Sequence, residues 1–282
     1  MKTRTKDNVL KDEECLQIIK KRLSRDKMED YSLVKYELIP IDGSSGFMGQ
    51  YFTLKATVTS PSSDTKNINF FAKIPPLQTS PLFEFNIEHG SFKKEVDLYT
   101  KVFPEVLRGL EQYNIPECFF AYGGDVIVLE DMFPEGYTMI NKHIPFDLNH
   151  CRVVMKTLAN FHAKSLIFEE RDKKKIHDEF SHCMHETLFP DKEEGRGRKM
   201  FTAAVRGVVS MIDLLGELND AEKMKFKETL VELSQNHAKK LLPSMRYKNV
   251  LCHGDLWANN ILFKYGDEGR PDACCLIDFQ LA

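Results

Sequence analysis

The chain has 282 residues, of which 42% are hydrophobic and 29% are charged, a composition typical of soluble globular proteins. This length allows one or two lobes, each able to bury its own core. The formal net charge of −3 gives no reason to expect nucleic acid or an anionic membrane as a partner.

The N-terminal residues 1–8 are charged, and no apolar stretch of the kind found in signal peptides follows them. No apolar run approaches the ~20 residues that a membrane-spanning helix needs. Seven cysteines, an odd number without secretory context, favour free thiols in a reducing compartment. We therefore expect a cytoplasmic protein, and the sequence leaves its oligomeric state open.

The first third of the chain predicts a helix followed by an antiparallel sheet. Residues 10–30 carry apolar side chains at helical spacing among charges, which predicts an amphipathic helix on the first lobe. Strands are predicted at 36–40 and 50–59, with Gly43, Gly46 and Gly49 between them. Glycines let backbone amides approach a phosphate closely, although a flexible hairpin turn explains them equally well.

The next predicted strand, residues 68–74, contains Lys73 near its end. Burying a lysine is costly unless it is paired, so Lys73 is either an exposed edge residue or has a charged partner. The helix predicted over residues 84–103 carries two candidates for that partner, Glu88 and Glu95. Glu95 lies within the compact helical pattern, whereas Glu88 precedes it.

The middle of the chain predicts a hairpin and then mostly helices. The hairpin covers residues 115–132, and we expect the chain after it to join the two lobes. Helical spacing recurs in three later segments, residues 148–168, 201–215 and 221–242. The highly charged segment 169–197 breaks this periodicity and is predicted to be a loop.

Polar residues follow apolar runs twice near the C-terminal end. His253, Asp255 and Asn260 lie between two strand-like runs, and Asp278 ends another such run. Each of these residues alone is explained by the turn preferences of Asp and Asn. Together, Asp255, Asn260 and Asp278 would present three oxygen side chains at neighbouring strand ends, a set that suits Mg²⁺.

The segments His253-Gly-Asp-Leu-Trp-Ala-Asn-Asn-Ile-Leu-Phe and Leu276-Ile-Asp-Phe-Gln resemble the ecdysteroid-kinase-like (CHK kinase-like) family. This family lies within the aminoglycoside phosphotransferase and choline kinase-like group. The resemblance runs from about Tyr36 to the end of the chain. It implies an α+β, bilobal protein kinase-like fold, with a small antiparallel-sheet N-lobe and a mainly helical C-lobe. Gly254 and Gln280 replace the Arg and Gly of the protein-kinase motifs.

The resemblance also implies the cofactors ATP and Mg²⁺ and a small-molecule alcohol as substrate. Asp255 would then orient or deprotonate the acceptor hydroxyl, and Asn260 and Asp278 would hold Mg²⁺. Lys73, positioned by Glu95, would neutralise the ATP phosphates. The other nucleotide contacts would come from the glycine loop and from the backbone after the hairpin: Gly46, Gly49, Glu130 and Met132.

By the same resemblance, the chain divides into an N-terminal helix (1–30), an N-lobe (31–132) and a C-lobe (133–282). In relatives, further helices follow the segment of Asp278 and build much of the acceptor pocket. Here the chain ends at Ala282, so we expect a C-lobe without its C-terminal helices, in a fragment or a naturally short form. Such a chain should phosphorylate an acceptor poorly, because a misplaced nucleophile reacts slowly.

Three functions are consistent with these motifs. The first is an ATP-dependent phosphotransferase acting on an ecdysteroid-like or other alcohol. The alternative is a catalytically weak nucleotide-binding or scaffold protein, although all five motif residues are present: Lys73, Glu95, Asp255, Asn260 and Asp278. A metal-dependent phosphohydrolase is the third, and it would need neither the Lys73–Glu95 pair nor an adenine site.

Overall fold

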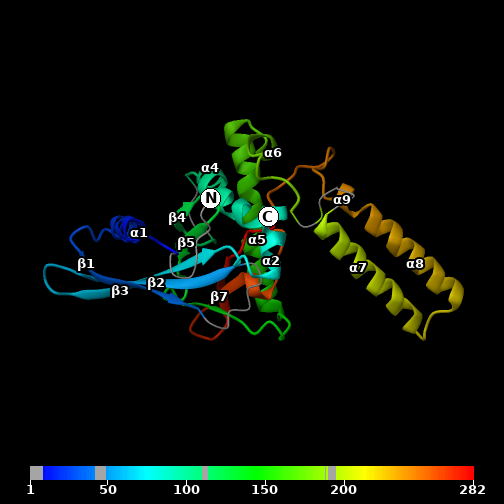
Figure 1. Cartoon of the computed structure of the whole chain (residues 1–282), viewed down its shortest axis with the longest axis horizontal. Coiled ribbons are helices and arrows are strands. Elements are labelled where there is room, and N and C mark those ends of the chain that lie inside the picture. The colour runs from blue at the N-terminus through cyan, green and yellow to red at the C-terminus, as the bar shows by residue number, and fades with distance from the viewer. Residues whose placement is uncertain (1–8, 42–48, 110–113, 188, 190–194) are drawn as a thin grey trace. The chain divides into compact units, whose positions relative to one another are not determined.

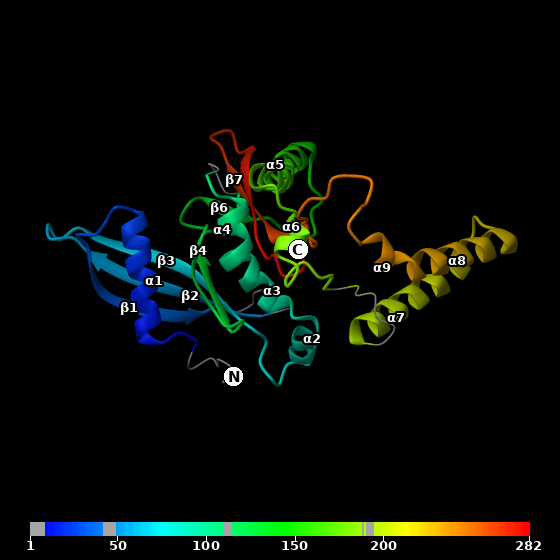
Figure 2. The ribbon, with the colours of Figure 1, turned by 90° about the horizontal axis from the view of Figure 1, so that it is seen from above.

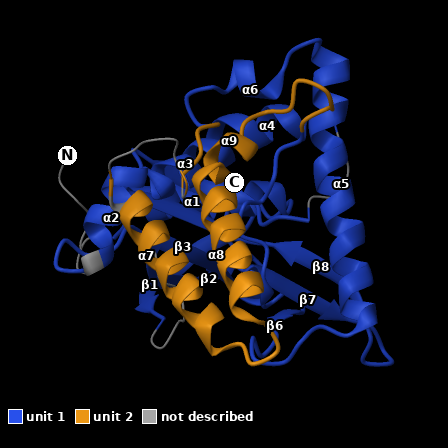
Figure 3. Ribbon diagram, turned by 90° about the vertical axis from the view of Figure 1, so that its right-hand side faces the viewer, with its two compact units in different colours: residues 1–183, 250–282 blue, residues 184–249 orange. Residues whose placement is uncertain are grey.

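The computed structural model describes residues 9–41, 49–109, 114–187, 189 and 195–282. The chain forms two compact units (Figure 3). Unit 1 contains Met1–Cys183 and Val250–Ala282, and unit 2 contains Met184–Asn249. Among the described residues, no helix is both long enough and apolar enough to cross a membrane.

A five-stranded antiparallel sheet dominates the first part of unit 1, with the strand order β1-β2-β3-β5-β4 (Figure 1). In β2, every second residue from Phe52 to Val58 is buried, as expected for a strand with one face on a core. The strands are β1 (Ser32–Pro40), β2 (Gln50–Thr59), β3 (Thr65–Ile74), β4 (Cys118–Tyr122) and β5 (Val126–Glu130).

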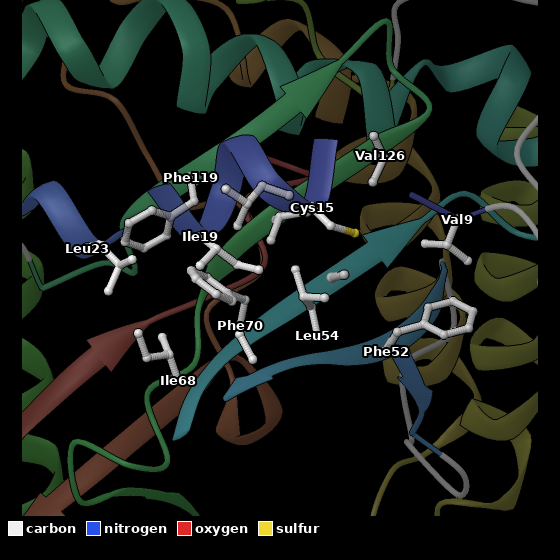
Figure 4. Packing of buried hydrophobic residues seen from close by; sticks show 14 of the residues in the cluster. Val9, Cys15, Ile19, Leu23, Phe52, Leu54, Ile68, Phe70, Phe119 and Val126 are labelled. Carbon is white, nitrogen blue, oxygen red and sulfur yellow. The ribbon is translucent and has the colours of Figure 1, made fainter. Parts of the chain in front are cut away.

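Helix α1 (Asp12–Arg25) lies across one face of this sheet (Figure 2). Its apolar stripe, Cys15, Ile18, Ile19 and Leu23, is buried against sheet residues that include Phe70 and Phe119 (Figure 4). The predicted amphipathic helix is confirmed, although it ends at Arg25 instead of continuing to residue 30. Burial of these apolar side chains against the sheet stabilises the packing of α1 on it.

The single helix predicted over residues 84–103 is wrong, because the chain turns at Gly90. Gly90 adopts a left-handed conformation with φ of +62°, which ends the first helix. The side chain of Asn86 then accepts hydrogen bonds from the Phe92 N–H and the Ser91 hydroxyl. The observed elements are α2 (Pro81–His89), α3 (Ser91–Asp97), the π-helix η1 (Leu98–Val102) and α4 (Phe103–Val106).

A second, three-stranded sheet in unit 1 has the order β6-β7-β8. It contains β6 (Tyr137–Met139), which the sequence did not predict, with β7 (Ile261–Tyr265) and β8 (Pro271–Leu276). Helix α5 (Leu148–Asp172) packs against β8 and begins at the capping residue Asp147. The short helices α6 (Ile176–Glu179) and η3 (Ala258–Asn260) complete this part.

Unit 2 is a helical hairpin. It consists of α7 (Arg196–Met211), η2 (Ile212–Leu214), α8 (Asp220–Gln235) and α9 (His237–Lys240). Asn219 and Glu222 form a capping box that fixes the start of α8. The expectation of a loop over residues 169–197 was wrong in three places. Helix α5 continues to Asp172, α6 forms within the segment, and α7 begins at Arg196. The predicted α+β class is confirmed.

Candidate active site

His253 connects the two polar segments near the C-terminal end of the chain. Its Nε2 lies 2.9 Å from the carbonyl oxygen of Ile277, and its Nδ1 accepts the backbone N–H of Asp255 at 3.3 Å. A carbonyl can only accept, so Nε2 carries the proton. Burial lowers the pKa of His253, which keeps the imidazole neutral. His253 therefore fixes the backbone of Asp255 relative to the residue before Asp278.

Asn260 orients Asp255 from the other side of the loop. The Asn260 Nδ2 donates to the main-chain oxygen and to Oδ2 of Asp255, both at 2.9 Å. Among the hydrogen bonds of the described residues, none uses Oδ1 of Asp255 or Oδ1 of Asn260. One oxygen of each residue thus remains for a ligand.

Asp278 lies at a strained position beside this loop. The Ile277 N–H donates to the Asn260 carbonyl at 3.0 Å, which fixes the chain just before Asp278. Asp278 itself has a φ of +64°, a left-handed conformation that is uncommon outside glycine and is often found at functional sites. Its side chain is 30% exposed, and Oδ1 lies 3.1 Å from the Lys73 Nζ.

Lys73 is buried between two carboxylates from distant parts of the chain. Its Nζ lies 2.8 Å from Glu95 Oε2 and 3.1 Å from Asp278 Oδ1. Burial alone would lower the pKa of Lys73, but the charges of Asp278 and Glu95 outweigh it and raise that pKa. Of the two expected partners, Glu95 makes the contact, because the turn at Gly90 directs α3 toward β3 and leaves Glu88 on α2.

Glu95 also reaches a group that the sequence did not predict. Its Oε1 accepts the backbone N–H of Phe279 at 3.1 Å. The Phe279 ring is fully buried and contacts aromatic rings from the helical segment after α3, from α5 and from the loop at His253: Tyr99, Phe103, Phe161 and His253. Only the Asp-Phe-Gln motif marks Phe279 in the sequence, and nothing there indicates these partners.

Two glycines of the site have no room for a side chain. A Cβ on Gly49 would lie 3.0 Å from the Ile74 carbonyl oxygen and 3.3 Å from Cγ of Lys73, so the backbone of Gly49 approaches the lysine closely. A Cβ on Gly254 would lie 1.9 Å from the carbonyl oxygen of Leu281, and the φ of Gly254 is +80°. Gly46, the other predicted phosphate contact, lies outside the described residues.

The backbone after β5 offers a limited set of groups for an adenine base. The Glu130 N–H donates to the Glu117 carbonyl at 2.8 Å, so Glu130 can offer only its carbonyl oxygen. The Met132 carbonyl accepts the Tyr137 N–H at 3.1 Å. Within the part of the chain that the structure describes, the Met132 N–H has no hydrogen-bond partner.

The oxygen groups of the site fit a magnesium ion shared with phosphates. Among the described residues, no cluster of three or more His, Cys, Asp or Glu could hold a metal by itself. Mg²⁺ commonly takes only one or two protein carboxylates and completes its shell with water and substrate phosphate. The partly exposed carboxylate of Asp278 and the Oδ1 of Asn260 match that requirement.

A model of the Ecdysteroid kinase-like family matches residues 44–282. The chain belongs to this family. The match confirms the resemblance inferred from the motifs, and with it the protein kinase-like fold, since the family lies in that superfamily. It also supports phosphotransferase chemistry in general. The search of curated proteins found no match.

Proposed function

We propose that this ecdysteroid kinase-like protein is an ATP-dependent kinase that transfers phosphate to a hydroxyl group of a small-molecule alcohol. The observation that supports it best is the buried Lys73 Nζ between Glu95 and Asp278. Burying three charges is expensive and is weak evidence for stability alone. In kinases, the same combination of a strand lysine, a helix glutamate and a metal-binding aspartate handles the nucleotide phosphates.

The nucleotide would bind through Lys73 of β3, the backbone at the end of β5 and after it, and the loops beside β7 and β8. Mg·ATP, when bound, supplies the phosphoryl group and a metal charge that neutralises the phosphate oxygens. Lys73 would donate to phosphate oxygens, and Asp278 and Asn260 would hold the metal through their oxygens. The carbonyl of Glu130 and the free N–H of Met132 would contact adenine, while Gly49 and Gly46 would line the phosphates.

Asp255 would receive the acceptor alcohol. Because Asn260 already occupies Oδ2, the hydroxyl would donate to Oδ1 of Asp255, which orients it and accepts its proton. His253 and Asn260 hold Asp255 through its N–H and its carbonyl, so the base is positioned before the acceptor arrives. Positioning and charge stabilisation would account for most of the rate, as in other phosphoryl transfers.

The direct test is an acceptor screen with the 282-residue chain, using steroid alcohols, choline and sugar alcohols. ADP release and the mass of the product are both recorded, with and without Mg²⁺. The proposal predicts acceptor-dependent ADP release and a phosphorylated alcohol, both lost in Asp255→Asn. Nucleotide binding without turnover would instead support the scaffold alternative. Phosphate release without a phosphorylated alcohol would support a phosphohydrolase.

A further inference from the structure

Helix α1 makes charged contacts with the chain where it leaves the large sheet. We propose that Arg22 and Arg25 of α1 position the connecting segment, residues 131–136, and thereby set the affinity for the adenine base. The inference rests on the proposed function, because it concerns the backbone groups of Met132 and Glu130 assigned there to adenine. It adds an element that precedes residues 44–282, the part matched by the family model.

The two arginines hold the connecting segment at both of its ends. Arg25 Nη1 lies 2.8 Å from Glu130 Oε1, and Arg22 Nη1 lies 3.3 Å from the same oxygen. Arg22 Nη2 also lies 3.6 Å from Glu135 Oε1. Glu130 directly precedes the segment and Glu135 lies near its end. The arginines therefore contact residues on both sides of Met132, the residue whose N–H would bind the base.

The arginines are themselves held in place by other side chains. Asp26 accepts from Arg22 Nε at 2.6 Å and from Arg25 Nε at 2.7 Å, and Arg25 Nη1 also contacts Glu117 at 3.0 Å. Burial raises the pKa of Asp26, but hydrogen bonds from both arginines outweigh it and lower that pKa. The side chains of Arg22 and Glu130 are only 12% and 15% exposed, so solvent screens this network less than a surface pair.

The base of the network is closely packed. The Phe119 ring of β4 lies beneath the charged ends of Lys21, Arg22 and Arg25, at 5.4, 5.7 and 5.2 Å from its centroid. The apolar side chains of α1 are buried in the core against the sheet (Figure 4). A helix that is packed against the sheet, with its arginines held by Asp26 and Glu117, can keep the side chains of Glu130 and Glu135 in place.

The connecting segment has few other constraints. The Phe133 N–H donates to Asp131 Oδ1 at 3.0 Å, and the Tyr137 N–H donates to the Met132 carbonyl at 3.1 Å. The Gly136 N–H also donates to the Phe133 carbonyl at 3.0 Å. The Asp131 side chain accepts a hydrogen bond from Asn69 of β3, so this contact and the two arginines together tie the segment to the N-terminal part of the chain. A shift of ~1 Å at the Met132 N–H would weaken a hydrogen bond to adenine, since such bonds depend steeply on geometry.

The test compares the double variant Arg22→Ala/Arg25→Ala with the wild type, using two probes in the presence of Mg²⁺. ATP contains the base, whereas inorganic tripolyphosphate contacts only the phosphate side. We expect the Kd for ATP to rise about tenfold, which is within the range of coupling between connected residues, and the Kd for tripolyphosphate to stay unchanged. Glu130→Gln, which keeps the backbone, should weaken ATP binding in the same selective way.

Lys21→Ala is the matched control, because Lys21 lies on α1 and over Phe119, but its polar partners in the described part of the chain are the Cys118 carbonyl and Glu117, not Glu130 or Glu135. It should leave both affinities unchanged. Equal ATP affinity in the double variant and the wild type would overturn the inference, and so would an equal loss for both probes or for Lys21→Ala. Hydrogen exchange of the amides in residues 131–136 gives a readout that needs no nucleotide, and it should speed up in the double variant alone.

These readouts separate the two claims. A wild type that binds neither probe would contradict the proposed function and the adenine role together. Faster exchange in residues 131–136 of the double variant would then still support the positioning of the segment by α1. Unchanged exchange would overturn that positioning even if the wild type binds ATP.

Discussion

Glu95 joins a helix of the N-terminal half to the backbone of Phe279, 184 residues later in the chain, through a hydrogen bond of 3.1 Å. The other oxygen of the same carboxylate holds Lys73 at 2.8 Å. Both contacts depend on the position of α3. A movement of α3 would therefore displace Lys73 and the segment of Asp278 together.

The first prediction concerns the buried pair. Lys73→Met or Glu95→Gln leaves the other residue buried without one of its charge partners, and should lower the free energy of unfolding by about 3 kcal/mol. The double variant should cost less than the sum by at least ~1 kcal/mol, because the two losses share one interaction. Urea unfolding of all four chains measures this cycle. Fully additive losses would show that the pair is not coupled in solution.

The second prediction concerns the metal. Asp278→Asn should abolish Mg²⁺-dependent ATP turnover, with a drop of at least ~100-fold. The variant would no longer hold Mg²⁺ firmly, and the negative charge on the phosphate would lose the stabilisation that the metal supplies. The fold should be retained, because Lys73 keeps Glu95 as a buried charge partner. Asp272→Asn is the control, since Asp272 is exposed on β8. Turnover that survives in Asp278→Asn would remove Asp278 from the metal site.

Much of the architecture could be predicted because each strand carries its own local signal. Residues 50–59 alternate apolar and polar side chains, and the observed β2 has those bounds. The break in the helix of residues 84–103 could not be predicted, because a single glycine inside a helical pattern is often tolerated. What divides it is a left-handed glycine together with an Asn86 side chain that caps the next helix.

The site shows the same contrast between local and long-range information. The motifs indicated Lys73, Asp255, Asn260 and Asp278, since each stands in or beside an apolar, strand-like run. Glu95 and Phe279 both lie in predicted segments, but the hydrogen bond between the Glu95 carboxylate and the Phe279 backbone joins residues 184 positions apart and has no local signal. Arg22 and Arg25 looked like ordinary charges of an amphipathic helix, and only the fold places them beside Glu130.

The third prediction concerns Gly254. Gly254→Ala introduces both a left-handed alanine and a 1.9 Å contact with the Leu281 carbonyl oxygen, so the backbone must move. Gly269→Ala is the matched control, because Gly269 has a φ of +69° with open space around it. The control should lose about 1 kcal/mol of unfolding free energy. Gly254→Ala should lose at least twice as much, and equal losses would contradict the close approach.

The fourth prediction concerns pH. Burial lowers the pKa of His253 below its usual value of about 6.5, so the unfolded chain takes up this proton first as pH falls. The native state should therefore lose stability as pH falls through about 6.5, and the loss is complete below the folded-state pKa. Denaturant unfolding between pH 8 and pH 5 measures it.

His253→Gln should reduce this pH dependence and leave the contribution of His162, whose pKa is also lowered by burial. The control is His143→Gln, because His143 is exposed in a turn. An identical pH dependence in the wild type and in His253→Gln would show that His253 is not held neutral by burial.

The most direct test of the central claim is a calorimetric titration of Mg·ATP into the wild type, Lys73→Met and Lys66→Met. Lys66 lies on the same strand as Lys73, but its side chain is 50% exposed and its ion pair is on the surface. The account predicts binding to the wild type and to Lys66→Met, with binding at least ~10-fold weaker in Lys73→Met. Equal affinity in all three chains, or no binding to the wild type, would contradict it.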